Sequence, residues 1–323
     1  MNGPYRWSSI TAADVAAWAE LTNHLAAVEG TEDFCDAEDR LEELQDPAID
    51  PQRDTLAAWH GHHMVGFGTV AVRPHPDSEG RIRVGIEGGV HPEHRGRGVG
   101  TAVMERMEAR GGEAAQRQHP GWAFHFDTGG GLAGSSARAF HHCRGYETAR
   151  HFHLMSRPLS PSDSSGQLLP SPTSADVVIR APEPQEEEAV LQAHRAAFAD
   201  HWGSAPPSAE RWHEKWTSRS SRHRVSRIAV DDSGAVLAYS LCGQWVEREL
   251  YVNLLGTVPS ARGHGLGSAV LAHTIEAAAA SRDYSVIELE VDSESLTGAT
   301  RLYERMGFSI KHTSALMRKR PSP

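Results

Sequence analysis

Two stretches of this 323-residue sequence decide its fold: residues 95–104 (RGRGVGTAVM) and residues 262–271 (RGHGLGSAVL). The arginine, all three glycines, one alanine and one valine coincide at a constant offset of 167 residues. Each stretch lies between a strand-like segment and a helix-like segment, so the agreement indicates an internal duplication. We therefore expect two copies of one fold.

The two halves present the same order of elements around these stretches. In the first half we expect a helical region at 11–44, strands at 55–59, 64–72 and 81–90, a helix at 98–116 and a strand at 122–127. In the second half the matching segments are 186–199, 227–231, 236–244, 250–258, 265–281 and 285–291. A short helix and a last strand follow in each half. Hairpins followed by a β-turn-α-β unit predict an α/β (α+β) class, with a mixed, mostly antiparallel sheet flanked by helices in each half.

The halves are joined by a segment rich in Pro, Ser and Gly, residues 158–175. It has neither helical nor strand periodicity and too few apolar residues to order itself, so it is typical of a linker. We expect an N-terminal domain at 1–158, a linker at 159–175 and a C-terminal domain at 176–323. Each domain is long enough to bury its own core.

Composition narrows the possible partners and compartment. A formal net charge of −10 disfavours nucleic acids and anionic membranes and is compatible with a cationic acceptor. Three distant cysteines (Cys35, Cys143 and Cys242) argue against a disulfide framework or a zinc knuckle. No signal peptide or membrane-spanning stretch is visible, so we expect a cytoplasmic protein. None of the 20 histidines has HExxH spacing or a cysteine at metal-ligand spacing, so we expect no metal. The sequence is also compatible with an oligomer.

The glycine-rich turns carry the first chemical signal. Closely spaced glycines let the backbone approach a ligand, and the start of a helix adds partial positive charge. Such a turn suits a pyrophosphate, although it could also be a simple helix entry. No GxxxxGK[ST] motif occurs, and a Rossmann fingerprint is poorly matched.

The pattern Arg-x-x-Gly-x-Gly resembles motif A of the GNAT superfamily of acetyl-CoA-dependent N-acetyltransferases. Downstream, residues 302–308 (LYERMGF) resemble its motif B, LYExxGF. The resemblance covers nearly the whole chain and implies acetyl-CoA binding, with a first half that is either structural or still retains the cofactor. The implied cofactor residues are Thr257, Val258, Arg262, Gly263, His264, Gly265, Leu266, Gly267 and Ser268, with Val90, Arg95, Gly96, Arg97, Gly98, Val99, Gly100 and Thr101 in the first half.

The resemblance also implies direct transfer of the acetyl group to an amine, without a covalent enzyme intermediate. Tyr303 matches the tyrosine that protonates the leaving thiolate, or it is a structural residue of its helix. Glu290 is the candidate base, with Glu288 in reserve on the same strand face; both could instead be solvent-facing acids. Asn253 stands where many members place a water-activating Glu. Glu249 could serve as a base through a water molecule. The resemblance also implies an oxyanion donor at the backbone N–H of Leu255 or Val258.

The first half lacks the second motif. Aligning Gly145 with Gly307 places His141 where Tyr303 stands, and an irregular glycine stretch (127–134) follows the preceding strand. We expect the first domain to be non-catalytic. A tandem with one reduced half is similar to the mycothiol synthases, although the turn at 254–262 differs from theirs.

The acceptor is expected to be a small-molecule primary amine. A protein or peptide N-terminal acetyltransferase and a non-catalytic acetyl-CoA sensor or scaffold are the alternatives. Asp200, His201 and Trp202 are the candidate acceptor contacts, with helix packing as the equally weighted alternative.

Overall fold

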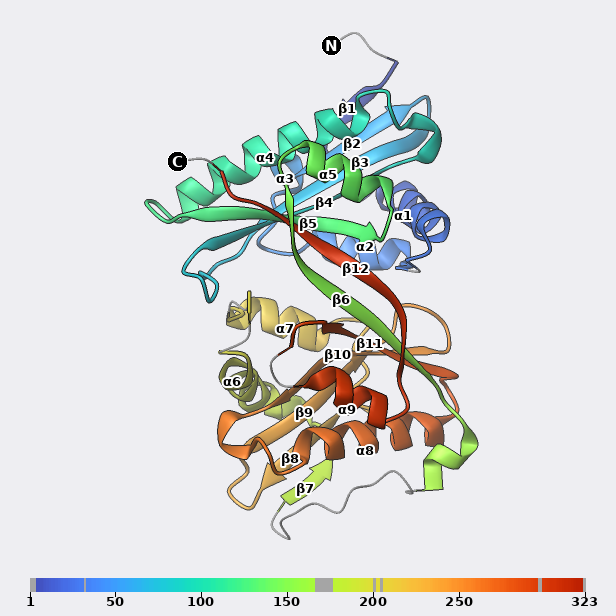
Figure 1. The fold of residues 1–323 in the computed structure, drawn as a ribbon, viewed down its shortest axis with the longest axis vertical. Helices are drawn as coiled ribbons and strands as arrows, with labels where there is room; N and C mark the ends of the chain where they lie inside the picture. Colours follow the sequence, from blue (N-terminus) through green and yellow to red (C-terminus); the bar gives the residue numbers. More distant parts are fainter. Residues whose placement is uncertain are drawn as a thin grey trace. The chain divides into compact units, whose positions relative to one another are not determined.

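The computed structural model describes residues 4–31, 33–165, 177–199, 202–203, 206–295 and 298–321. The chain divides into two compact units (Figure 1). The first unit comprises residues 1–151 together with 314–323, and the second comprises residues 152–313. Each unit is described by itself below.

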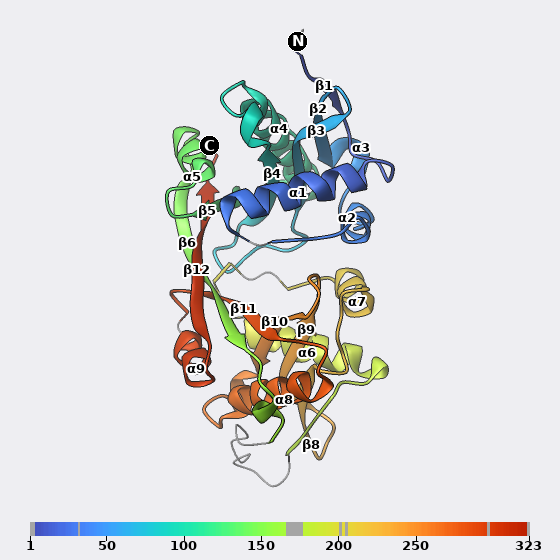
Figure 2. The same ribbon diagram turned by 90° about the vertical axis from the view of Figure 1, so that its right-hand side faces the viewer.

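The first unit is built on a sheet with the strand order β1-β2-β3-β4-β5-β12. All neighbours pair antiparallel except β4 and β5, which are parallel. Helices α1 and α2 cover one face of this sheet and α4 covers the other (Figures 1 and 2). The elements are β1 (Arg6–Ser8), α1 (Val15–Glu29), α2 (Ala37–Leu44), α3 (Pro51–Asp54), β2 (Thr55–His60), β3 (His63–Val72), β4 (Ile82–Val90), η1 (Pro92–His94), α4 (Val99–Gln118), β5 (Phe124–Leu132), α5 (Ser136–Cys143), the start of β6 (Glu147–Pro158) and the end of β12 (Ser309–Lys319).

The second unit repeats this plan with the strand order β6-β11-β10-β9-β8-β7. Its one parallel pair is β10 with β11. Helix α8 packs on one face, and α6 and α7 lie on the other. Its elements are η2 (Pro161–Ser165), β7 (Val177–Arg180), η3 (Pro184–Glu186), α6 (Glu187–Phe198), α7 (Ala209–Thr217), β8 (Arg227–Asp231), β9 (Val236–Gly243), β10 (Glu249–Thr257), η4 (Pro259–Ala261), α8 (Leu266–Ser281), β11 (Val286–Asp292) and α9 (Ala299–Arg305). The predicted class, a mixed and mostly antiparallel sheet flanked by helices, is confirmed.

Two glycines of β3 bring helix α4 directly onto the sheet. A Cβ atom on Gly66 would lie 2.7 Å from Val99, and one on Gly68 would lie 2.5 Å from Val103. Both valines are buried residues of α4. Any larger residue at either glycine would push the helix away from the strand. The sheet therefore fixes where α4 begins, and with it the glycine turn that precedes the helix.

The last strand of each half belongs to the other unit. Residues 152–158 of β6 pair antiparallel with β11 in the second unit, and residues 314–319 of β12 pair antiparallel with β5 in the first. The units therefore differ from the predicted boundaries at 152–158 and at 314–323. Antiparallel ladder pairing, which a linear division of the sequence does not reveal, decides where these strands lie.

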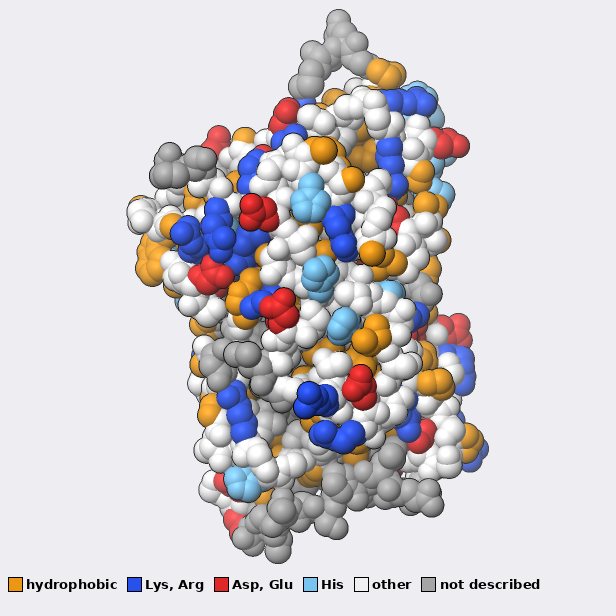
Figure 3. Space-filling view, in the orientation of Figure 1, with side chains coloured by type: hydrophobic (Ala, Val, Ile, Leu, Met, Phe, Trp, Pro, Cys, Tyr) orange, Lys and Arg blue, Asp and Glu red, His pale blue; other side chains and the backbone are white. Residues whose placement is uncertain are grey.

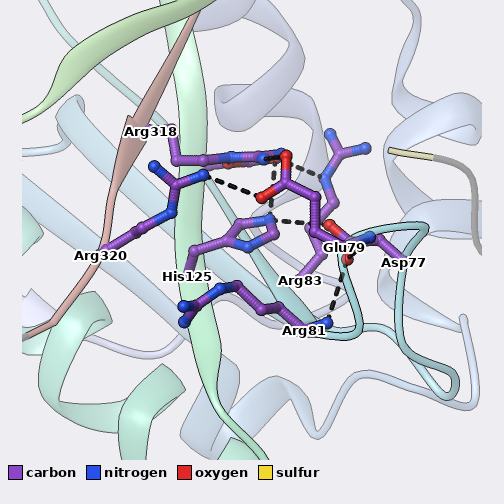
Figure 4. A network of polar contacts seen from close by, with 8 residues as sticks. Asp77, Glu79, Arg81, Arg83, His125, Arg318 and Arg320 are labelled. Atoms are coloured by element: carbon purple, nitrogen blue, oxygen red, sulfur yellow. Dashed lines mark hydrogen bonds and ion pairs between the residues drawn. The ribbon is translucent and has the colours of Figure 1, made fainter. Parts of the chain in front are cut away.

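A buried arginine anchors each exchanged strand. Arg157 in β6 donates to the carbonyl of Met306 and forms an ion pair with Asp163 at 2.6 Å. Arg318 in β12 forms two hydrogen bonds with Asp127, of 2.7 and 2.9 Å, inside the network that Figure 4 shows. Burial raises the pKa of Asp127, but His125 and Arg318 outweigh it and hold the pKa at about 2. Asp127 is therefore a carboxylate at neutral pH.

The glycine stretch 127–134, expected to be irregular, is largely a strand. β5 continues to Leu132 and pairs with β12, with Gly129 opposite Leu316 and Leu132 opposite Ser314. A Cβ atom on Gly130 would lie 2.7 Å from the side chain of Met317. The glycines thus give β12 room to pack, which the sequence of the first half alone does not indicate.

Two further expectations are refined by the structure. The helical region 11–44 is two helices, separated where Gly30 takes a left-handed φ of 70°. The predicted linker contains the short helix η2, and its residues 166–175 lie outside the described part of the chain.

Two properties bear on what the protein can bind: the distribution of its surface charge and the hydropathy of its helices. Acidic and basic side chains are interspersed on the face drawn in Figure 3, so the net negative charge does not form one field there. No helix in the described ranges is long and apolar enough to cross a membrane.

Candidate functional site

The two glycine turns repeat the same backbone geometry. Each begins with a short helix, η1 or η4, and ends at a glycine with positive φ: Gly98 at 83° and Gly265 at 77°. The arginine amide donates to a proline carbonyl in both, over 3.2 Å at Arg95 and 3.3 Å at Arg262. The repeat seen in the sequence is therefore a repeat in three dimensions.

Both turns leave a helix N-terminus uncapped. Neither α4 nor α8 has a side-chain hydrogen bond at its N-cap or an acidic residue in its first turn. The first backbone N–H groups of each helix are therefore not satisfied by a side chain of that helix and can donate to an anion. The predicted cofactor residues occupy this turn in each unit. In the first unit, Val90 ends β4, Arg95, Gly96, Arg97 and Gly98 form the turn, and Val99, Gly100 and Thr101 open α4. In the second, Thr257 ends β10, Val258 precedes η4, Arg262, Gly263, His264 and Gly265 form the turn, and Leu266, Gly267 and Ser268 open α8.

The parallel strands separate beside each turn, and we call the place between their unpaired ends the slot. β4 pairs with β5 only over residues 82–85, and β10 pairs with β11 only over residues 249–252. Beyond these points the two strands of each pair are no longer hydrogen-bonded to one another. Backbone groups at the ends of β4 and β10 can then pair with a ligand instead. A slot that leads to a helix N-terminus fits a ligand with a long arm attached to a pyrophosphate.

In the first unit this slot opens into a cavity of about 680 Å³. Its walls include the glycine turn, the end of β4, the C-terminal part of α1 and one face of α5. Glu87 lines it without a hydrogen bond or ion pair among the described residues. Arg95 lines it too, but its guanidinium is already engaged by Glu29, Ser136 and the carbonyl of Val90.

His141 and Tyr303 occupy equivalent places, on the helices α5 and α9. The amide of Tyr146 donates to the carbonyl of His141 over 3.0 Å, and the amide of Phe308 donates to that of Tyr303 over the same distance. Both side chains are buried. The alignment that placed His141 opposite Tyr303 in the sequence therefore matches the geometry.

The two side chains differ in what they can do with a proton. Burial raises the pKa of Tyr303 to about 12, and its hydroxyl has no hydrogen-bond partner among the described residues. Tyr303 belongs to the same buried cluster as Val252 and Leu289, where the second slot begins. Burial and the charge of Arg144 lower the pKa of His141 to about 4. At neutral pH the tyrosine holds a transferable proton, whereas the imidazole is uncharged.

The candidate bases are not equally placed. Glu288 is buried and forms an ion pair with Lys311 at 2.9 Å, so its carboxylate is committed. Glu290 lies on the same strand and is exposed. The amide of Val258 donates to the carbonyl of Leu237 over 2.9 Å, so it is not available as an oxyanion donor.

Asn253 lies at a β-bulge, because the register of β10 against β9 shifts between Val252 and Leu254. It lines a second cavity, of about 20 Å³, together with His223 and Lys215. Sequence reasoning missed His223, because no motif marks a loop residue that only folding brings to β10. No trio of His, Cys, Asp or Glu side chains within the described ranges is arranged to bind a metal ion.

The acceptor candidates are only partly placed. Trp202 is half-buried, whereas Asp200 and His201 lie outside the described residues.

Comparison with known proteins agrees with this geometry. The model of the acetyltransferase (GNAT) family matches residues 18–119 and 188–308. The mycothiol acetyltransferase of Salinispora tropica is 30% identical over 321 residues, covering 94% of this chain and 92% of its own. That of Kineococcus radiotolerans is 34% identical over 248 residues, covering 73% of this chain and 72% of its own.

Solved structures share the fold across the whole chain. A GCN5-related N-acetyltransferase from Sphaerobacter thermophilus has a TM-score of 0.76 at 24% identity, covering 100% of this chain and 98% of its own. A tandem GNAT protein from the clavulanic acid biosynthesis pathway has a TM-score of 0.67 at 18% identity, covering 99% of both chains. The predicted family and the predicted enzyme class are confirmed: the chain belongs to the GNAT family of acetyltransferases and is an N-acetyltransferase.

Proposed function

We propose that the second unit transfers the acetyl group of acetyl-CoA to the primary amine of a small molecule, and that the first unit holds acetyl-CoA without turning it over. The observation that carries this proposal is the difference between Tyr303 and His141 at equivalent places. At this place the second unit has a buried phenol with a pKa of about 12, whereas the first unit has an imidazole.

Residues of both turns would bind the cofactor. The N–H groups that open α8 and α4 would donate hydrogen bonds to its pyrophosphate, and the unpaired ends of β10 and β4 would line its arm. Acetyl-CoA supplies an activated acetyl group when bound. The unpartnered hydroxyl of Tyr303 would give its proton to the leaving sulfur.

The acceptor amine would have to lose a proton before it can attack. Glu290 is the acid on β11 that stays exposed, and Asn253 can orient a water molecule. The backbone N–H of Leu255 would donate to the oxyanion, because the N–H of Val258 already donates to the carbonyl of Leu237. A cationic acceptor fits the net charge of −10.

The curated relatives named above favour a small-molecule acceptor, because they match most of the chain and are named for a small molecule. Binding of the acceptor near Trp202, and near Asp200 and His201 of the same segment, is part of this proposal. We infer a cytoplasmic location on the same basis.

The test is a panel of amines that includes the acceptor of the mycothiol acetyltransferases, with released CoA thiol as the readout. The wild type is compared with Tyr303→Phe and with the matched His141→Phe. We expect Tyr303→Phe to lower kcat at least about 100-fold, because the lost proton donor has no replacement, and His141→Phe to leave it unchanged.

Two outcomes would contradict the proposal. Equal losses in both variants would show that the first unit also turns over. Tight binding of acetyl-CoA without turnover of any amine or peptide would favour the sensor alternative instead.

A further inference from the structure

His223 lies in the loop between α7 and β8, and its ring is held in one orientation. Its Nε2 atom lies 2.8 Å from the carbonyl oxygen of Trp216, and its ring packs against that of Trp216, tilted by 48° with centroids 4.4 Å apart. A carbonyl oxygen only accepts hydrogen bonds, so Nε2 carries the hydrogen in the neutral ring. The lone pair is therefore on Nδ1.

This Nδ1 atom is buried and has no hydrogen-bond partner in the described part of the chain. A buried acceptor without a partner costs on the order of 1–3 kcal/mol unless water or a ligand satisfies it. The cavity of about 20 Å³ beside it is large enough for about one water molecule. His223 and Asn253 both line that cavity, so a water there would have a basic nitrogen and an amide within its walls.

The cavity adjoins the slot of the second unit through Asn253. Asn253 directly follows Val252, which is the last residue of β10 that pairs with β11. The bulge at Asn253 inserts an extra residue at this point of the ladder with β9. A water bound here would thus lie next to the position where the strands separate.

We propose that His223, and not Glu290, accepts the proton of the acceptor amine through a water molecule held by Asn253. This inference rests on the proposed transfer in the second unit. One N–H bond of the ammonium breaks and its proton passes to the water oxygen, while one O–H proton of that water passes to Nδ1. The products are a neutral amine and an imidazolium, so charge and protons balance, and the imidazolium later returns its proton to solvent.

The other titratable groups facing the cavity do not replace His223. Lys215, from α7, has only donors when charged. Cys242, from β9, is fully buried, and burial raises the pKa of its thiol to about 12. The remaining polar groups of the wall, from Trp212, Trp216, Ser221, Ser226 and Asn253, do not titrate.

His223→Gln is the decisive variant, because a glutamine amide can still donate to the Trp216 carbonyl while the basic Nδ1 is lost. We expect kcat/KM to fall about 100-fold and its pH profile to lose the acid limb that an imidazole produces. The affinity for acetyl-CoA should be unchanged. The matched control is His213→Gln, in an exposed histidine of α7 bonded to Glu187, which should keep the wild-type profile.

Adding Asn253→Asp to His223→Gln places a carboxylate at the water site and should restore kcat/KM at least about 10-fold. A histidine with a merely structural role would not be rescued in this way. Nitrogen-15 NMR of the whole protein gives a readout independent of turnover: His223 should carry its proton on Nε2.

The outcomes separate the two proposals. Wild-type turnover that needs Tyr303 but is unaffected by His223→Gln overturns the relay alone, as does an Nδ1–H tautomer. Absence of amine turnover by the wild type overturns the relay together with the proposed function.

Discussion

The strands that lead into the two glycine turns, β4 and β10, differ although the turns themselves coincide. β4 pairs with β3 in an unbroken register from Val84 to Val90. β10 carries a bulge at Asn253 against β9. The residue equivalent to Asn253 in the repeat is Ile86, which is buried in the core of the first unit.

This difference distinguishes anion binding from proton transfer. The geometry shared by both units, a positive-φ glycine followed by an uncapped helix, suits the binding of an anion. In the described part of the chain, the bulge in the strand that leads into the turn, and the buried Tyr303, occur in the second unit. The proposed transfer would therefore combine an anion-binding turn that both units share with proton-moving groups of the second unit.

Arg318→Met tests how strongly the first unit depends on the end of the chain, and we expect the largest stability loss from it. Asp127 is buried, and its remaining basic partner within ion-pair distance would be Arg83 at 3.1 Å, with His125 at 3.5 Å. A buried carboxylate that loses its main partner destabilises a protein by about 3–5 kcal/mol. Urea unfolding measures the change.

The control for this prediction is Arg320→Met, two residues further along. The Arg320 side chain is 52% exposed and pairs with Glu79 at the surface. Its loss should cost less than about 1 kcal/mol. Equal losses in the two variants would show that the Asp127 pair does not hold the strand.

The duplication, the turns and the tyrosine could be predicted because each is a local pattern. Spaced glycines dictate a backbone shape wherever they stand, and Tyr303 lies within a short motif. The exchanged strands could not be predicted, because β6 and β12 have ladder partners that local sequence does not encode. His223 was missed for the same reason: its role depends on a cavity that folding creates.

Acidification should destabilise both units, because each contains a histidine whose pKa is lowered by burial. Burial, with Arg144, lowers the pKa of His141 to about 4, and burial, with Lys215 and Arg195, does the same for His194 in the second unit. Below the unfolded pKa of about 6.5, the unfolded chain takes up a proton that the folded chain refuses. Stability should therefore fall as the pH drops from about 6.5 to 4, by up to about 3 kcal/mol for each histidine.

The measurement is the free energy of unfolding at pH 7 and at pH 4.5 for the wild type, His141→Leu and His194→Gln. The glutamine keeps a partner for the hydroxyl of Tyr239, which lies 2.7 Å from His194. Each variant should flatten the pH dependence by a similar amount. A slope that is unchanged in one variant would mean that this histidine is protonated in the folded unit.

The smallest expected effect comes from the glycines that open α4 and α8. Alanine at Gly98 or Gly265 would meet no atom within 4 Å, so each substitution costs only the strain of a positive φ, about 1–2 kcal/mol. The same strain at Gly121 and Gly234, whose Cβ positions are equally open, provides controls outside the turns.

Calorimetric titration with acetyl-CoA should show two sites in the wild type, and each turn variant should weaken one of them about tenfold. Gly265→Ala should raise the KM for acetyl-CoA and Gly98→Ala should not, because only the second site feeds turnover; a raised KM in Gly98→Ala would instead make the first site part of the reaction.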